Sequence, residues 1–219
     1  MKNIPALWGI VFTLVPFTVP TVFADPATVN QCEKGDAQVC YETALKLIKD
    51  DGLENIQEAL NYLSKGCDNG YAPSCALGGS LALSAVKDVD MAFSLFKKGC
   101  AMNHGKSCFH LAQLYKDGRG TPANLIAAAD SYNKACDSGE GEACVNLGIM
   151  YIGGAGVVQN FKQANIALTK ACDLKIGSGC AALGQMYERG DGTDKDRVKA
   201  LELYKKGCEL GFKSVCNRK

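Results

Sequence analysis

The sequence lacks an excess of charge of either sign, with 24 basic and 23 acidic residues among 219. This balance disfavours a nucleic-acid binder, which needs a basic stripe, and disfavours electrostatic docking to an anionic membrane surface. The sequence also has only two histidines, and it contains no Cys-x-x-Cys motif of the kind that redox-active thiols use. We therefore expect no nucleic-acid partner and a structural role for the twelve cysteines.

The first 24 residues carry a single charge, at Lys2, and continue as an apolar stretch that ends at Ala24. This is the layout of a secretory signal peptide. A membrane anchor is the alternative, but three prolines interrupt the stretch and no stop-transfer pattern follows it. We expect a cleaved signal peptide over residues 1–24, no membrane span after cleavage, and a secreted or periplasmic protein.

All twelve cysteines follow this segment, and an even, abundant set of cysteines in an exported chain indicates disulfides. They fall into six pairs with a separation of eight: Cys32/Cys40, Cys67/Cys75, Cys100/Cys108, Cys136/Cys144, Cys172/Cys180 and Cys208/Cys216. From Cys100 onward the pairs recur every 36 residues, and the earlier steps are 35 and 33. A period in the mid-thirties is typical of a two-helix repeat.

The residues between the pairs recur in register with the cysteines. Four residues after each second cysteine lies a small residue: Ala44, Gly79, Ala112, Gly148 or Gly184. Eight, four and two residues before the next pair lie an alanine, a large apolar residue and a lysine, as in Ala164, Leu168 and Lys170. Steps of three, four, seven and eight place such residues on one helical face, where small residues allow two helices to approach closely.

The pattern predicts an all-α protein, an α/α-superhelix (solenoid) of about five two-helix, tetratricopeptide-like repeats in a single domain over 25–219. A leading half-unit (26–39) precedes hairpins at 40–67, 75–100, 108–136, 144–172 and 180–208, and a C-terminal end covers 209–219. Glycine-rich turns, such as Gly118 to Pro122, separate the two helices of a unit. The second hairpin is irregular, because its turn near Val86–Asp90 is short and lacks glycine.

Two disulfide patterns are geometrically open. Bridges of the Cys40–Cys67 kind would leave Cys32 and Cys216 unpaired, and their separations would vary from 25 to 28. The eight-residue pattern pairs all twelve cysteines at a constant separation, but eight helical residues span about 12 Å, beyond the ~7 Å that a disulfide permits. The helix must therefore break inside each pair, and a glycine lies in every intervening segment: Gly35, Gly70, Gly105, Gly139, Gly177 and Gly211. We predict Cys32–Cys40, Cys67–Cys75, Cys100–Cys108, Cys136–Cys144, Cys172–Cys180 and Cys208–Cys216, each joining consecutive hairpins.

The unit running from Cys144 through Leu147-Gly148, Tyr151 and Gly154 to Cys172 resembles a Sel-one-like repeat, as does the unit from Cys180 to Cys208. Cysteines paired eight apart behind a signal peptide are similar to the Helicobacter cysteine-rich protein family. The resemblance covers nearly all of residues 30–216. It implies an exported α/α-superhelix. It also implies penicillin binding with slow β-lactam hydrolysis, since members carry β-lactamase names, and the wider repeat class serves as protein-interaction scaffolds.

A serine β-lactamase needs a serine with a lysine one helical turn later, to take its proton. Three pairs have this spacing: Ser84/Lys87, Ser94/Lys97 and Ser131/Lys134. About one such pair is expected by chance for this composition, and no Lys-Thr-Gly motif follows. The catalytic residues therefore stay unknown.

The histidines, His104 and His110, flank Cys108 and could form a zinc site with Cys100. The predicted Cys100–Cys108 disulfide is the favoured alternative, because it matches the other five pairs. We expect no metal and no cofactor.

The first helix of each unit also has a face directed away from the packed side. In curved helical repeats these faces usually line the concave surface. The candidate binding residues on it are Glu42, His110, Gln113, Asn146, Gln185 and Arg189. We expect a monomeric scaffold that binds a protein, a peptide or a peptidoglycan-like cell-wall fragment. The alternative is a penicillin-binding protein with slow β-lactamase activity.

Overall fold

The computed structural model describes residues 26–49 and 53–218, so the predicted signal peptide lies outside the described residues. The described part contains eleven α-helices and no strand. The helices are α1 (Pro26–Glu33), α2 (Ala37–Ile48), α3 (Leu53–Asp68), α4 (Ala72–Leu81), α5 (Val89–Ala101), α6 (Gly105–Asp117), α7 (Leu125–Asp137), α8 (Gly141–Gly153), α9 (Phe161–Asp173), α10 (Gly177–Arg189) and α11 (Arg197–Glu209). A π-helix (Ala82–Val86) extends α4, and a 3₁₀ turn (Lys213–Val215) follows α11. None of these helices is long and apolar enough to cross a membrane.

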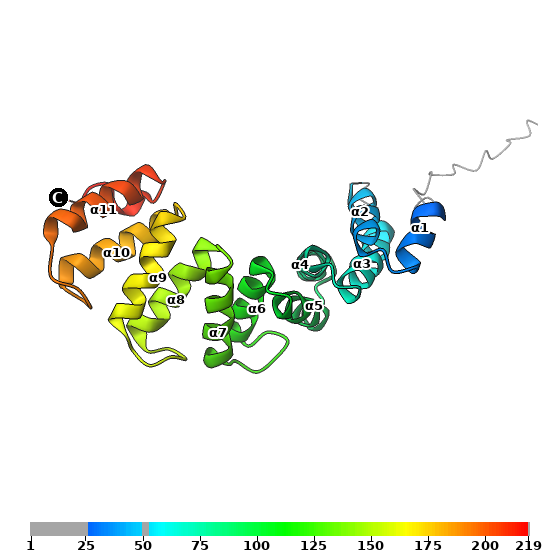
Figure 1. The fold of residues 1–219 in the computed structure, drawn as a ribbon, viewed down its shortest axis with the longest axis horizontal. Coiled ribbons are helices and arrows are strands. Elements are labelled where there is room, and N and C mark those ends of the chain that lie inside the picture. Colours follow the sequence, from blue (N-terminus) through cyan, green and yellow to red (C-terminus); the bar gives the residue numbers. More distant parts are fainter. Residues whose placement is uncertain (1–25, 50–52, 219) are drawn as a thin grey trace, which may run out of the picture.

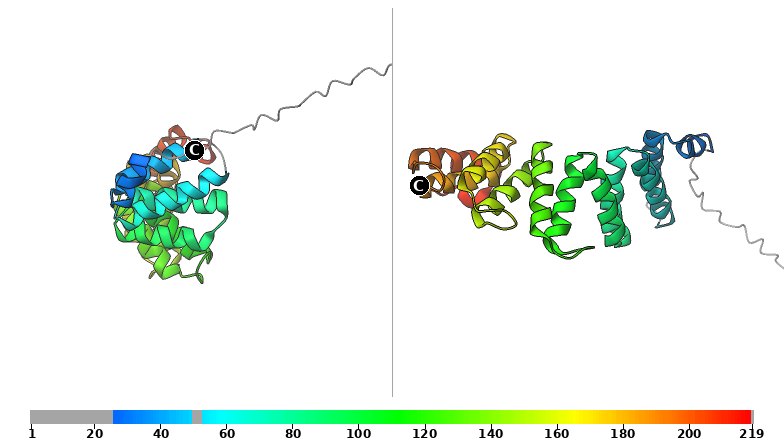
Figure 2. Two further views of the ribbon diagram at one scale, coloured as in Figure 1. Left: turned by 90° about the vertical axis from the view of Figure 1, so that its right-hand side faces the viewer. Right: turned by 60° about the horizontal axis from the view of Figure 1, so that its bottom comes forward.

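The helices pair as α2 with α3, α4 with α5, α6 with α7, α8 with α9, and α10 with α11, and each pair packs on the next. They lie side by side along one row, and the row bends into an arc (Figures 1 and 2). The core therefore runs along the solenoid as a series of clusters between neighbouring helices. The predicted all-α, disulfide-stapled solenoid is confirmed.

The first helix of every unit begins three residues before the second cysteine of its pair, earlier than the predicted start at the cysteine itself. Side-chain capping accounts for this start in α2 and α6, whereas the N-cap residues of α4, α8 and α10 make no such hydrogen bond. Asp36 accepts a hydrogen bond from the backbone N–H of Val39, and His104 accepts one from the N–H of Ser107, so each satisfies a free donor of the first turn. The second cysteine therefore lies inside the helix, one turn from its N-terminus.

The two helices of a unit approach closely at the position four residues after the second cysteine. Ala44 and Ala112 are fully buried there. At Gly79 a Cβ atom would lie 2.6 Å from the Phe96 ring, and at Gly148 it would lie 2.7 Å from Leu168 Cγ. These distances are shorter than any real carbon–carbon contact, so the large residue of the second helix fills the volume that a side chain would occupy.

All six predicted cysteine pairs have their sulfur atoms at disulfide distance, from 1.95 to 2.08 Å, with Cα atoms 4.5–4.9 Å apart. In the first five pairs the chain leaves a helix after the first cysteine, turns, and enters the next helix before the second cysteine. The last bridge, Cys208–Cys216, instead ties the 3₁₀ turn to α11. Each of the first five disulfides therefore joins two successive units.

Two of the six linkers turn in an unexpected way. Gly105 and Gly177 do not supply the left-handed turn residue there, because Asn103 (φ 58°) and Lys175 (φ 64°) adopt that conformation. Both glycines are instead the first residue of a helix. A Cβ at Gly177 would lie 2.9 Å from the carbonyl oxygen of Gly207 on α11, the other helix of the same unit, and a Cβ at Gly105 would lie 2.9 Å from Ser138 Cβ in the linker after α7. These glycines therefore allow close packing against the second helix of the unit and the linker that follows it.

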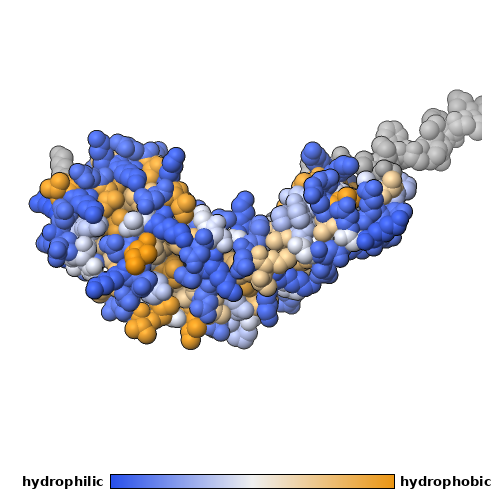
Figure 3. Space-filling view, viewed as in Figure 1, coloured by the Kyte–Doolittle hydropathy of each residue, from blue (hydrophilic) through white to orange (hydrophobic). Residues whose placement is uncertain are grey.

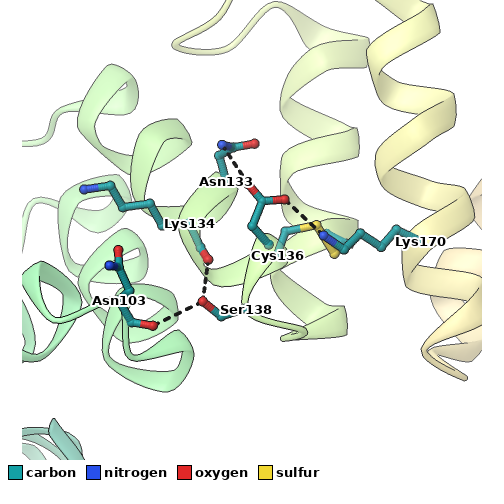
Figure 4. A network of polar contacts seen from close by, with 8 residues as sticks. Asn103, Asn133, Lys134, Cys136, Ser138 and Lys170 are labelled. Carbon is teal, nitrogen blue, oxygen red and sulfur yellow. Dashed lines mark hydrogen bonds and ion pairs between the residues drawn. A yellow bond between two sulfur atoms is a disulfide. The ribbon is translucent and has the colours of Figure 1, made fainter.

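A row of ion pairs crosses from unit to unit beside the disulfides. In each of these pairs the lysine lies two residues before the first cysteine of one disulfide. Its acidic partner directly follows the first cysteine of the previous disulfide. The pairs are Lys65–Glu33, Lys98–Asp68, Lys170–Asp137 and Lys206–Asp173. Figure 4 shows the Lys170–Asp137 contact beside Cys136. At one position the row is interrupted, since Ala101 stands where Lys134 would meet a carboxylate. A hydrogen bond from Ser138 Oγ to the Asn103 carbonyl, 3.2 Å long, joins those two units (Figure 4).

The second hairpin departs from the others, as its sequence predicted. Its first helix ends in the π-helix, and Lys87 (φ 62°) takes the left-handed position that Gly118, Gly154 and Gly190 take elsewhere. Asp88 then caps α5 by accepting a hydrogen bond from the N–H of Met91. The turn therefore holds only two residues, and α5 starts inside the segment predicted to be the turn.

Candidate functional site

A cavity of about 270 Å³ lies between the first helices of the first three units. It is lined by Tyr41, Pro73, Ala76, Leu77, Ser80, His104, Lys106 and His110, from α2, α4, α6 and the turn before α6. In the view of Figure 1, α2 and α4 lie on the upper side of the arc, above α3 and α5. The same view drawn as a surface is mainly hydrophilic, with apolar residues interspersed (Figure 3).

His110 is held on one side of this cavity by aromatic contacts. Its ring centroid lies 4.9 Å from that of Phe96 and 5.4 Å from that of Phe109. Its Nδ1 is 3.2 Å from Gln113 Oε1, and since an amide oxygen can only accept, Nδ1 carries the proton of this bond. His110 is half-buried, so the sequence-based expectation that it points outward is only partly correct.

His104 stands at the N-cap of α6. Its Nδ1 accepts from the Ser107 backbone N–H at 3.4 Å, so the neutral ring carries its proton on Nε2. Burial lowers the pKa of His104 below its usual value; the nearby Glu140 opposes this shift and Lys106 adds to it. The neutral imidazole is therefore the favoured form, with one N–H left to donate.

Lys106 is the permanent charge of the cavity. It is exposed, and it forms no ion pair with any residue in the described part of the chain. None of the eight lining residues is acidic. Ser80 Oγ donates to the Ala76 carbonyl at 2.9 Å, which leaves its oxygen as an acceptor. The lining thus combines a cation and polar groups with three apolar residues, Pro73, Ala76 and Leu77.

The predicted binding residues divide into two groups. His110 lines the cavity, and Gln113 bonds to it. Glu42 lies beside Tyr41 but bonds to Gln38 at 2.9 Å and does not line the cavity. The remaining three lie on α8 and α10, in later units: Asn146, Gln185 and Arg189. That they bind a ligand stays a prediction.

The serines with a lysine three residues later do not gain a catalytic geometry in the described residues. Ser131 is 6% exposed, and its Oγ donates to the Ala127 carbonyl at 2.8 Å. Ser84 and Ser94 are exposed, and no hydrogen bond joins either of them to its lysine. A zinc site with Cys100 is disfavoured as well, because that sulfur lies 2.07 Å from Cys108 Sγ. Among the described residues no cluster of potential metal ligands was found.

Sequence reasoning missed several cavity residues, above all Tyr41 and Lys106. Tyr41 follows a second cysteine directly, while Lys106 belongs to the segment between two paired cysteines, which was interpreted only as a linker. The available signal was the clustering of His104, Lys106 and His110 within seven residues. That signal was weighed only as a zinc site.

Helical hairpins of about 36 residues, stacked in a row and joined between units, define a repeat solenoid. The Sel1 repeat family model matches residues 37–71, 76–104, 105–140, 141–175 and 177–212. This chain belongs to the Sel1 repeat family. The matched segments cover most of the chain and include every residue that lines the cavity except Pro73.

Solved structures agree with this assignment. A Sel1 repeat protein from Oxalobacter formigenes is 25% identical with a TM-score of 0.70, over 78% of this chain and 70% of that one. Helicobacter pylori cysteine rich protein B is 28% identical with a TM-score of 0.51, over 60% of this chain and 96% of that one.

A curated relative, cytochrome c oxidase assembly factor 7 of Xenopus tropicalis, is 33% identical over 108 residues. This match covers 44% of the present chain and 46% of that protein, so it spans less than half of the relative's length.

Proposed function

We propose that this protein is an exported, monomeric scaffold that binds a peptide, a cell-wall fragment or a partner protein on the surface of its first helices. The observation that supports the proposal most is the cavity between α2, α4 and α6, whose lining combines apolar and polar residues. Few, well-placed polar groups in a mainly apolar hollow are typical of ligand sites. The twelve paired cysteines suit an oxidising compartment such as the periplasm or the medium.

Capture of partners from the exported fraction tests this function. The oxidised protein over residues 25–219 is immobilised beside two variants that each add an indole. Ser80→Trp fills the cavity, whereas Thr169→Trp adds the same bulk to an exposed position on α9. We expect a partner that the parent protein and Thr169→Trp retain and that Ser80→Trp loses. A partner held equally by all three proteins, or no specific partner at all, would count against the proposal.

The alternative function, penicillin binding with slow β-lactam hydrolysis, rests on the family resemblance alone. Its test is to incubate the oxidised protein with benzylpenicillin and to follow ring opening and covalent mass. We expect neither, because Ser131 is buried and bonded to backbone. An adduct that disappears with Ser84→Ala or Ser94→Ala would make the enzyme the primary function.

A further inference from the structure

The cavity between α2, α4 and α6 has a basic residue in its lining but no acidic one, and this difference indicates the kind of ligand that it favours. The permanent charge in its lining is the Lys106 ammonium, which has no carboxylate partner in the described structure. Two acidic side chains lie nearby, outside the lining. Glu42 bonds to Gln38, whereas Glu140, at the N-cap of α8, makes no capping hydrogen bond and acts on His104 through its charge. The lining itself carries one positive charge and no negative one, and it therefore favours an anion.

We infer that this cavity binds the free C-terminal carboxylate of a peptide. The Lys106 ammonium is the ion partner, and the Nε2–H of His104 is a hydrogen-bond donor to the same group, because Nδ1 of that ring already accepts from Ser107. This inference rests on the proposed binding function and names the chemistry that the site selects.

Three features favour a peptide terminus over a phosphate group. A phosphate dianion is best matched by several fixed positive charges or by an arginine fork, and the lining offers one lysine. The lining residues Pro73, Ala76 and Leu77 are apolar and suit an aliphatic terminal side chain. The volume of about 270 Å³ lies just below the range for drug-sized ligands, so it suits the last one or two residues of a chain.

The test uses two pools of N-acetylated tetrapeptides of random sequence, identical except that one has a free C-terminal carboxylate and the other a C-terminal amide. Binding to the ¹⁵N-labelled, oxidised protein over residues 25–219 is followed by backbone amide shifts. We expect the acid pool to shift amides of residues 76–80 and 104–110, with at least tenfold higher affinity than the amide pool.

Two matched lysine variants locate the effect. Lys106→Gln should bring the affinity for the acid pool down to that for the amide pool, at least tenfold weaker than in the parent protein. Lys162 is the second residue of α9, as Lys106 is of α6, so Lys162→Gln is the matched control. It should leave the affinity for both pools unchanged. His104→Asn keeps an N-cap acceptor while removing the Nε2 donor, and should weaken binding of the acid pool alone.

The outcomes separate this inference from the proposed function. Equal affinity for both pools, or shifts confined to α8 and α10, would overturn the carboxylate site and leave a peptide-binding scaffold. The absence of shifts from either pool at millimolar concentration would overturn peptide binding and the carboxylate site together. Loss of binding in Lys162→Gln as well as Lys106→Gln would indicate general charge attraction and would also overturn the site.

Discussion

Removal of one inter-unit disulfide should cost more in the middle of the solenoid than at its end. The central variant is Cys100→Ala/Cys108→Ala, which disconnects α5 from α6. The second variant is Cys208→Ala/Cys216→Ala, which releases the 3₁₀ turn from α11, and there Cys208 is half-buried and Cys216 is exposed. Both disulfides join cysteines eight residues apart, so the loss of chain entropy that each bridge prevents in the unfolded state is the same for the two variants.

The magnitude follows from the loop size. A loop of this length gives about 2.5 kcal/mol on the chain-entropy relation. Cys100 and Cys108 are also 4% and 0% exposed, so truncating both adds a packing loss of roughly 1 kcal/mol. We therefore expect the free energy of unfolding to fall by about 3–4 kcal/mol for the central variant and by at most about 2.5 kcal/mol for the second one.

Urea unfolding followed by far-UV circular dichroism measures both values, after a thiol assay has verified that the remaining cysteines are oxidised. A central loss below about 1 kcal/mol, or a loss in the second variant that exceeds the central one, would refute the reasoning. A lower slope with denaturant in the central variant alone would mean that the units on the two sides of the missing bridge unfold separately, as expected for a nearest-neighbour solenoid.

Three further predictions concern side chains in contact with the core or with the next unit. Tyr132→Phe removes a buried hydroxyl that has no hydrogen-bond partner in the described structure, and it should raise the free energy of unfolding by roughly 1 kcal/mol. Tyr204→Phe, at the matching position of the last unit, removes a 2.8 Å hydrogen bond to the Glu188 carboxylate and should lower the free energy of unfolding. Urea midpoints of the two variants test both expectations. Ala101→Asp should complete the row of ion pairs with Lys134 and add about 0.5 kcal/mol or less, a gain that must vanish in 1 M salt. Because burial lowers the folded-state pKa of His104, its stabilising contribution is present above the unfolded pKa of about 6.5 and is lost as the pH falls through the folded value. The unfolding midpoint should therefore drop more between pH 7.5 and pH 5 than it does in His104→Asn, and an equal drop would contradict this assignment.

The sequence predicted the architecture because the period, the register and the disulfide spacing are all properties of the linear chain. Bridges of constant separation and a small residue facing a large one need only helix geometry to be interpreted. The turns were less predictable. At Asn103 and Lys175 a residue other than glycine takes the left-handed conformation, three residues after the first cysteine. The other four linkers have their glycine at this register position, but these two linkers have it two residues later, which pointed the prediction to the wrong residue.

The candidate site was harder to predict than the fold for a physical reason. Its walls come from three successive units, so Tyr41, Leu77 and Lys106 meet only after the units have stacked with their particular bend. An analysis of the sequence one repeat at a time can predict only which residues of each first helix face outward. It therefore found His110 but missed Tyr41 and Lys106.

The six cysteine loops have a consequence for proteolysis. A protease that cuts between Cys136 and Cys144, for example at the exposed Gly139, leaves both fragments joined through the disulfide. A cut in a hairpin turn such as the one after Gly118 lies between two bridges, and nothing covalent then connects the fragments. The linkers between paired cysteines can therefore be cut without dividing the molecule, whereas a cut in a turn within a hairpin separates it.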